Sequence, residues 1–297
     1  MNEQTDRIGI IGGSGLGAAL LAAGVGKPVE VDTPFGKPSA PLVVGEWEGV
    51  PIAFLPRHGT GHTIPPSAVP YRANIWALKA AGCRWIVASG AVGSLREEIA
   101  PRSLVIPDQV IDRTTQRVST FFDEPGAAVH AEFAEPFCPK LRAILTGIGA
   151  SVNGIDVRNG GTYVCMEGPA FSTTAESLMH RQWGGDLIGM TAMPEAKLAR
   201  EAEIAYGLVA LATDYDCWRP HHAVANKQAL LAEIIENMHV ATENALKLIR
   251  AALPAIWSRR GDTFEAHRAL ELAIWTPKDK IPAAMKDRLG LLWGRYL

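Results

Sequence analysis

The fold is set near the amino end by the stretch Ile8-Gly9-Ile10-Ile11-Gly12-Gly13-Ser14-Gly15-Leu16-Gly17-Ala18. Its β-branched start predicts a buried strand, and the residues from Gly15 to Ala23 predict a helix directly after it. The glycines between the two let the backbone approach an anion, which the N-terminus of a helix attracts. The stretch therefore predicts a strand–turn–helix unit that binds phosphate. A tight turn without a ligand is the alternative.

Strands and helices alternate along the rest of the chain. Further strands are predicted at residues 42–47, 50–55, 85–89, 104–106, 109–112, 162–166, 187–190 and 206–213, and helices at 71–81, 138–148, 173–183, from 194 and at 225–253. Glu48-Gly49 predicts a hairpin turn, and a small-residue turn is expected after Ser89. We therefore expect an α/β fold. A single domain over residues 1–257 would hold a mixed, largely buried sheet in a three-layer αβα arrangement, with a helical extension over residues 258–297 packed on or near it.

Composition excludes several classes of protein. Of the 297 residues, 47% are hydrophobic and 20% charged, and 29 Lys and Arg against 31 Asp and Glu exclude a broadly basic nucleic-acid-binding protein. No apolar run is long enough to predict a membrane span. The apolar amino end resembles a signal peptide, but Glu3, Asp6 and the glycines argue against one. The four cysteines are widely spaced among apolar residues, so we expect reduced thiols and a cytoplasmic protein.

Two acids follow an apolar strand at Asp214 and Asp216. If the strand continues, residues two apart point to the same face, and the two carboxylates converge on one site. Buried acids need partners, and a purine offers N7 and a 6-amino group as partners for them. A solvated turn at the strand end is the simpler alternative.

A polar loop follows the predicted strand 50–55. The guanidinium of Arg57 and the imidazole of His58 suit the oxygens of a phosphate. His58 and His62 have the spacing of metal ligands on a helix, but Gly59 and Gly61 argue against a helix there, so no metal is expected. An exposed loop without a ligand is the alternative.

Two further features leave the ligand open. Met166 and Phe171 offer an apolar and aromatic wall for a heteroaromatic base, although core packing explains them equally well. The glycine-rich turn after residue 12 also fits the loosened dinucleotide fingerprint, with Glu30 and Asp32 near the distance of a ribose-binding acid. A nicotinamide-dependent dehydrogenase is therefore a rival interpretation, and a non-enzymatic nucleotide-binding module is another.

Taken together, these stretches resemble the 5′-methylthioadenosine phosphorylases of the purine nucleoside phosphorylase family. The matching segments run in order from residue 8 to about residue 218. They are Gly9–Leu16, Arg57–Gly59, Asn74–Lys79, Gly93–Glu98, Asp108-Gln109, Ile111–Thr114, Glu135–Pro139, Glu167–Pro169, Phe171-Ser172, Met190-Thr191, Pro194-Glu195 and Ala212–Trp218.

The resemblance implies reversible phosphorolysis of an N-glycosidic bond in a homotrimer or a dimer of trimers, with phosphate as co-substrate and no metal or organic cofactor. It implies phosphate binding by Ser14, Arg57, His58, Ala91 and Thr191, a base wall of Met166 and Phe171, a ribose contact from Met190, purine recognition by Asp214 and Asp216, and a 5′ contact by His130 of a neighbouring subunit. Ala223, Val224 and Leu230 would supply apolar surface to the 5′ substituent.

The chain departs from this pattern at a few positions. Gly90 and Ala170 replace a hydroxyl and a basic residue, and Asn226 and Lys227 interrupt the apolar face of the helix expected at the 5′ substituent. Phosphorylases that prefer adenosine, methylthioinosine or other 6-oxopurine nucleosides are therefore alternatives to a methylthioadenosine phosphorylase. The acid pair favours aminopurines, because an ionised Asp216 repels a 6-oxo group.

Overall fold

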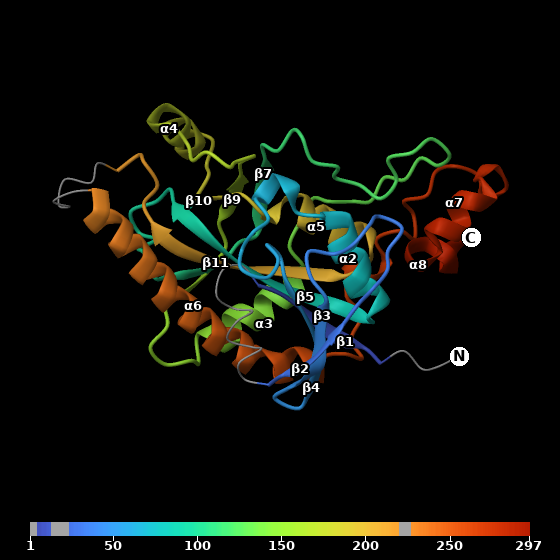
Figure 1. The fold of residues 1–297 in the computed structure, drawn as a ribbon, viewed down its shortest axis with the longest axis horizontal. Coiled ribbons are helices and arrows are strands. Elements are labelled where there is room, and N and C mark those ends of the chain that lie inside the picture. The colour runs from blue at the N-terminus through green and yellow to red at the C-terminus, as the bar shows by residue number, and fades with distance from the viewer. Residues whose placement is uncertain (1–4, 13–23, 220–226) are drawn as a thin grey trace.

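One long strand organises the sheet. In the computed structural model, which describes residues 5–12, 24–219 and 227–297, β5 (Cys83–Ser94) pairs in parallel with β1 (Arg7–Gly12) and with β11 (Ala205–Asp214). Its last residues, Gly93 and Ser94, pair antiparallel with β10 (Leu187–Gly189). Because β5 carries partners along its whole length, its carboxyl end lies between the ends of two other strands (Figure 1).

The described residues form a sheet in the order β2-β3-β4-β1-β5-β10-β9-β7, and β11 joins β5 to β6, which pairs with β8. The remaining strands are β2 (Gly26–Val29), β3 (Leu42–Trp47), β4 (Val50–Pro56), β6 (Leu104–Ile106), β7 (Gln109–Asp112), β8 (Val157–Asn159) and β9 (Thr162–Cys165). Parallel pairs such as β1 with β4 and antiparallel pairs such as β3 with β4 both occur, so the sheet is mixed as predicted.

The two faces of the sheet belong to two buried clusters. Ile86 and Ala88 on β5 pack into one cluster, and Trp85 and Val87 into the other, because alternate side chains of a strand point to opposite faces. Helices cover both faces: α2 (Tyr71–Ala80) and α5 (Ala192–Glu201) the first, α3 (Pro139–Gly149) and α6 (Lys227–Ser258) the second (Figure 1). The expected α/β class, a buried sheet between helices, is confirmed.

Local turn and cap chemistry also agrees with the sequence. Glu48 and Gly49 both have positive φ, 54° and 71°, as a two-residue hairpin between β3 and β4 requires. Thr173 caps α4 (Thr174–Gln182), where a helix over residues 173–183 is expected, and the side chains of Thr173 and Glu176 form a reciprocal capping box.

The predicted end of a strand at Ser89 is wrong. β5 continues to Ser94 because β10 and β11 both pair with its final residues. Small residues in this stretch resemble a turn, but Gly93 serves close packing instead. A Cβ there would lie 3.2 Å from Asp216 Cβ and 3.3 Å from Asp214 Oδ1.

The topology argues against the dehydrogenase interpretation. A dinucleotide site needs a parallel βαβ unit with its acid after the second strand. The strand before Glu30 and Asp32 is β2, which pairs antiparallel with β3 at the edge of the sheet. Both acids are exposed. The predicted helix over Gly15–Ala23 lies outside the described residues.

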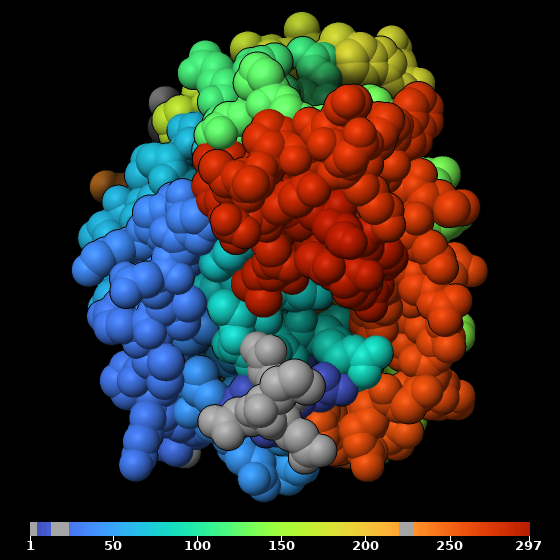
Figure 2. Space-filling model, turned by 90° about the vertical axis from the view of Figure 1, so that its right-hand side faces the viewer, coloured from blue at the N-terminus to red at the C-terminus, as the bar shows by residue number. Residues whose placement is uncertain are grey.

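The carboxyl-terminal residues pack against the rest of the chain. α7 (Ala283–Arg288) and α8 (Gly290–Trp293) follow α6, and Trp293 is fully buried with its ring 5.0 Å from that of Phe122. Trp293 belongs to the same cluster as Ile11 and Ile86. Figure 2 shows these residues spread over one face of the molecule. The division of the chain at residue 257 stays a prediction.

Within the described residues, no helix is both long and apolar enough to cross a membrane. The four cysteines are free thiols, and three of them are buried.

Candidate active site

Most of the predicted site residues that the structure describes line one cavity of about 500 Å³. Its walls come from the ends of β5, β10 and β11, from the loop after β4, from residues 166–172 and from α6. Its lining includes Arg57, His58, His62, Ala91, Met166, Phe171, Met190, Thr191, Asp214 and Asp216. Sites outside the carboxyl ends of strands are the usual ones in open α/β sheets.

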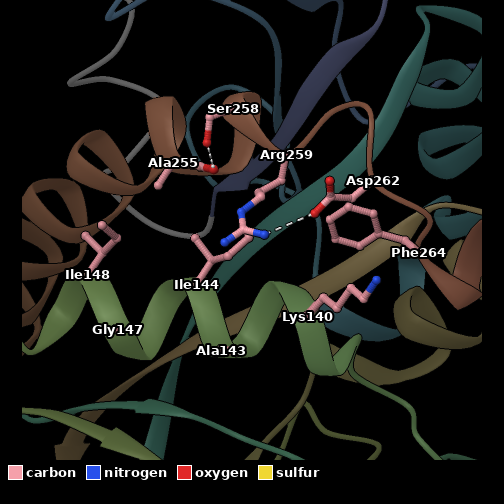
Figure 3. Close-up of a pocket in the computed structure, with 10 residues that line it drawn as sticks. All are labelled: Lys140, Ala143, Ile144, Gly147, Ile148, Ala255, Ser258, Arg259, Asp262 and Phe264. Atoms are coloured by element: carbon pink, nitrogen blue, oxygen red, sulfur yellow. Dashed lines mark hydrogen bonds and ion pairs between the residues drawn. The ribbon is translucent and has the colours of Figure 1, made fainter.

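A second hollow of about 540 Å³ lies between α3 and the end of α6 (Figure 3). Its charged side chains already have partners: Arg259 lies 3.2 Å from Asp262, and Lys140 donates to the carbonyl of Thr263. Ile144, Ile148 and Phe264 make much of the remaining wall. The first cavity is therefore the candidate active site.

Asp214 and Asp216 lie together at the first end of this cavity, called the acid end. The strand does not continue through them as the sequence reasoning assumed. β11 ends at Asp214, and Asp216 sits in a turn with φ of 50°. Its backbone N–H donates to Asp214 Oδ1 at 2.7 Å, and Thr213 Oγ1 donates to Asp214 Oδ2 at 2.6 Å. The carboxylates therefore converge through a turn.

Burial and the neighbouring charge of Asp214 raise the pKa of Asp216, although a hydrogen bond from Ser177 opposes this shift. Ser177 lies on α4, is fully buried and donates its hydroxyl to Asp216 Oδ2. Sequence reasoning missed Ser177, because nothing local separates it from an exposed helical serine.

The second end, called the cation end, is organised by Arg57, whose side chain is 1% exposed. The Nε and Nη2 atoms of Arg57 bind both oxygens of Glu195 at 2.7 and 2.8 Å, and Nη1 donates to the carbonyl of Ser89 at 2.9 Å. Tyr206 also donates to Glu195, at 2.7 Å. The Nε and Nη2 side of the guanidinium is therefore occupied by Glu195. The Nη1 atom, which has a second N–H group, is the part of Arg57 that can bind an anion.

Gly90 lies between Arg57 and Thr191. A Cβ on this glycine would lie 3.4 Å from Thr191 Oγ1 and 3.9 Å from Arg57 Nη1. The family resemblance implies a hydroxyl residue at this position. With glycine there, no side chain fills the space between the hydroxyl of Thr191 and the guanidinium of Arg57. An oxyanion placed there would receive hydrogen bonds from both side chains.

His58 is neutral in this site. Burial lowers its pKa to about 4, and the nearby Arg57 and His62 act in the same direction. Its Nδ1 donates to the carbonyl of Ile64 at 2.8 Å, so the neutral ring offers Nε2 as an acceptor. The rings of His58 and His62 lie 4.4 Å apart. No cluster of three or more metal-ligating side chains occurs in the described part of the chain.

Between the two ends the wall is apolar. Met166, Phe171 and Met190 line it, and Phe171 is 83% exposed at the mouth. The wall contributed by α6 consists of Leu231, Ile234 and Met238. The predicted Leu230 is not among the lining side chains, because it lies one position away from the helix face that meets the cavity. Ser14, Ala223 and Val224 lie outside the described residues.

His130 is not among these lining residues and lies on a short ribbon. Its N–H donates to the carbonyl of Ala273 and the N–H of Trp275 donates to that of Ala128, so the two segments run side by side. The rings of His130 and Trp275 are 4.7 Å apart. Leu272 and Trp275 are 88% and 71% exposed. The ribbon therefore presents a histidine among apolar side chains to the surroundings.

Comparison with known proteins points to one family. A family model described as the phosphorylase superfamily matches residues 7–254. The S-methyl-5′-thioadenosine phosphorylase of Synechocystis sp. is 50% identical over 293 residues, which cover 97% of this chain and 87% of that protein. That of Thermosynechococcus vestitus is 47% identical, over 99% of this chain and all of its own length.

Solved structures agree. A methylthioadenosine phosphorylase sourced from an Antarctic soil metagenomic library is 46% identical, with a TM-score of 0.89, over 98% of this chain and 99% of its own. A variant adenosine/methylthioadenosine phosphorylase from Schistosoma mansoni in complex with methylthioadenosine is 36% identical, with a TM-score of 0.81, over 90% of this chain and 98% of its own. The fold and the sequence are thus similar to theirs over nearly the whole chain.

Proposed function

This chain belongs to the phosphorylase superfamily, and on that premise we propose that it cleaves 5′-methylthioadenosine with phosphate, yielding adenine and 5-methylthioribose 1-phosphate. The observation that carries the proposal is the pairing of two chemistries in one cavity. Two carboxylates meet at the acid end, and a guanidinium, a neutral imidazole and a hydroxyl meet at the cation end.

The reaction needs a held nucleophile and a better leaving group. A phosphate oxygen at the cation end attacks the anomeric carbon as the N-glycosidic bond breaks, so the protein itself needs no nucleophile. Arg57, His58 and Thr191 hold that phosphate, with Ser14 and the backbone at Ala91. Electrons from the broken bond pass to the purine, and Asp214 shares a proton with N7 as that charge grows.

The acid end favours a 6-aminopurine. Asp216 accepts a hydrogen bond from the 6-amino group, while Met166 and Phe171 cover the base. Ser177 supports this role because its hydroxyl holds Oδ2 and so fixes the orientation of the carboxylate. A 6-oxopurine offers only an acceptor at the same position, and an ionised Asp216 opposes it.

The apolar wall favours a methylthio group over a hydroxyl. Leu231, Ile234 and Met238 face the cavity from α6 and offer no hydrogen-bond donor. Burying apolar surface contributes about 25 cal/mol per Å², whereas a buried hydroxyl must keep a hydrogen bond. Adenosine phosphorolysis is the second candidate, supported by the adenosine named for the S. mansoni relative.

We also propose that the site is completed in a homo-oligomer, as a trimer or a dimer of trimers. The ribbon that carries His130 exposes apolar side chains of a kind that partner subunits cover, and the mouth of the cavity is open at Phe171. His130 of one subunit would then reach the 5′ end of the substrate in the next. Free thiols favour a reducing compartment such as the cytoplasm.

The experiment is incubation with methylthioadenosine and phosphate, with adenine release measured. We expect release that depends on phosphate, a higher kcat/KM for methylthioadenosine than for adenosine or methylthioinosine, and no change when nicotinamide dinucleotide is added. Equal release in phosphate-free buffer would make the protein a hydrolase. A higher kcat/KM for adenosine would overturn the 5′ assignment.

The oligomer is tested by mass in solution and by mixing. Subunits carrying Asp214→Asn and subunits carrying His130→Ala should be weakly active alone and regain activity when reassembled together, since one intact site then forms across an interface. A fully active monomer would contradict this arrangement.

A further inference from the structure

Arg117 is a buried cation with no place in the proposed reaction. It lies in the connection between β7 and α3, and its side chain is 1% exposed. The guanidinium donates to five oxygen acceptors. These are Glu167 Oε1 at 2.9 Å, the carbonyl of Glu167 at 2.5 Å, Tyr71 Oη at 3.2 Å, and the carbonyls of Met190 and Met193 at 2.6 and 2.7 Å.

These acceptors lie in segments that line the cavity. Glu167 directly follows Met166, and the carbonyls of Met190 and Met193 bracket Thr191. Arg117 therefore ties the base wall to the segment that presents Met190 and Thr191. It is not itself a lining residue of the cavity.

The Met190–Met193 segment needs an external support. Thr191 has φ and ψ of −126° and −11°, and Met193 has −118° and 136°, so neither residue has helical geometry. Pro194 follows and has no N–H to give. Carbonyls on such a segment must find donors outside it. Arg117 donates to two of these carbonyls, those of Met190 and Met193.

Glu167 anchors the guanidinium from the other side. Its Oε2 accepts the N–H groups of Thr115 and Gln116 at 2.6 and 3.1 Å, while Oε1 accepts from Arg117. The carboxylate thus holds both the side chain of Arg117 and the backbone that precedes it. The Nε, Nη1 and Nη2 atoms reach acceptors on three sides of a planar fork, which the single ammonium of a lysine cannot match.

We propose that Arg117 is a positioning residue that fixes the Met190–Thr191 segment and so sets the affinity of the cavity for phosphate. The inference rests on the proposed function. Arg117 does not contact Asp214 or Asp216, which bind the base in the proposed function. Adenine should therefore bind nearly as before when Arg117 is changed.

The test compares Arg117→Lys with Arg200→Lys. Arg200 is a matched control because it is also buried, binds the carboxylate of Glu132 and donates to the carbonyls of Glu132 and Glu135, but does not line the cavity. Phosphate and adenine affinities are measured by calorimetry, kcat and KM by adenine release, and folding by melting temperature.

We expect Arg117→Lys to lower kcat/KM about a hundredfold, as a shift of about 1 Å in a reacting group does, mainly through the KM for phosphate. Adenine affinity should change far less. Arg200→Lys should lower the melting temperature to a similar degree and leave the phosphate KM near that of the unmodified protein.

If Arg117→Lys does not fold, Glu167→Gln tests the same support with a smaller change in the same direction. Unchanged phosphate affinity in a folded variant at either position would overturn the proposal, as would an equal loss of phosphate affinity in Arg200→Lys. Failure of the proposed function is distinguishable, because the unmodified protein would then release no adenine while its phosphate affinity stays measurable.

Discussion

The two ends of the cavity manage charge in opposite ways. At the cation end, Arg57 is neutralised by Glu195, which Tyr206 also binds, and the group is almost completely buried. At the acid end, Asp214 and Asp216 lie side by side, supported by hydroxyls and backbone N–H groups. A buried ion pair holds its side chains in one geometry. Two neighbouring carboxylates repel each other, which favours binding of a proton or of a hydrogen-bond donor. The contrast fits a site that holds phosphate at one end and shares a proton with a purine at the other.

The largest effect should come from Asp214→Asn. Loss of the carboxylate that we propose shares a proton with the leaving purine should lower kcat about 100- to 10,000-fold. The amide oxygen can still accept from the N–H of Asp216, so the melting temperature should hardly change. Steady-state kinetics and a melting curve check both statements. A kcat close to that of the unmodified protein would remove Asp214 from the chemistry.

The second effect concerns stability at the cation end. Arg57→Met leaves Glu195 buried without its cation and should lower the free energy of unfolding by about 3–5 kcal/mol. The double variant Arg57→Met/Glu195→Leu removes both charges and should recover most of that loss. Denaturant unfolding measures the cycle. If the single and double variants are equally unstable, the ion pair does not organise this end.

Asp216→Asn should change selectivity more than rate. Ser177 donates to one oxygen of Asp216, so in the variant it holds the amide oxygen and turns the NH₂ group toward the base. A lost hydrogen bond to a charged partner is worth about 1.5–3 kcal/mol, so preference should move about ten- to a hundredfold from aminopurine to 6-oxopurine nucleosides. Ratios of kcat/KM for the two classes measure the shift. An unchanged ratio would place Asp216 away from the base.

The smallest effect compares two neutral histidines, His58 in the cavity and His267 outside it. Burial lowers the pKa of His267 to about 4, and its Nδ1 accepts from Arg84 Nη2 while Nε2 donates to the carbonyl of Arg84. The unfolded histidine titrates near 6.5. Between these values the unfolded chain binds the extra proton, so the free energy of unfolding falls as pH drops from about 6.5 to about 4.

His267→Gln should reduce this acid-induced loss by about 1–2 kcal/mol without altering the KM for phosphate. His58→Gln should alter both. Unfolding curves at several pH values, with phosphate kinetics, separate the two residues. A His267 variant with the full acid-induced loss would show that its ring does not titrate in this range.

The sequence is most informative where chemistry is local. Glu48-Gly49 and the cap at Thr173 depend on near neighbours, and their geometry follows from residue type. The class of fold likewise follows from alternation along the chain. The sequence also predicts that Asp214 and Asp216 converge on one site. It predicts this from a continuing strand, whereas in the structure a turn after β11 brings the two carboxylates together.

Contacts between distant segments could not be predicted in this way. Arg57 and Glu195 are 138 positions apart, so only the folded sheet shows that the guanidinium fork faces a carboxylate. Gly93 resembles a turn residue, whereas its lack of a side chain makes room for Asp214 and Asp216. On α6 the sequence predicts Leu230 at the cavity, whereas Leu231 lines it. The rotation of a helix relative to a cavity is set by tertiary packing.

The burial of Trp293 in the cluster that also holds Ile11 has a consequence for synthesis. One cluster includes both Ile11 and Trp293, so its side chains come from segments that leave the ribosome far apart in time. Domains tend to fold from the amino end while the ribosome is still elongating the chain. Here the cluster lacks Trp293 until that residue leaves the ribosome, so nascent chains stalled before residue 293 should expose apolar surface that the folded protein buries.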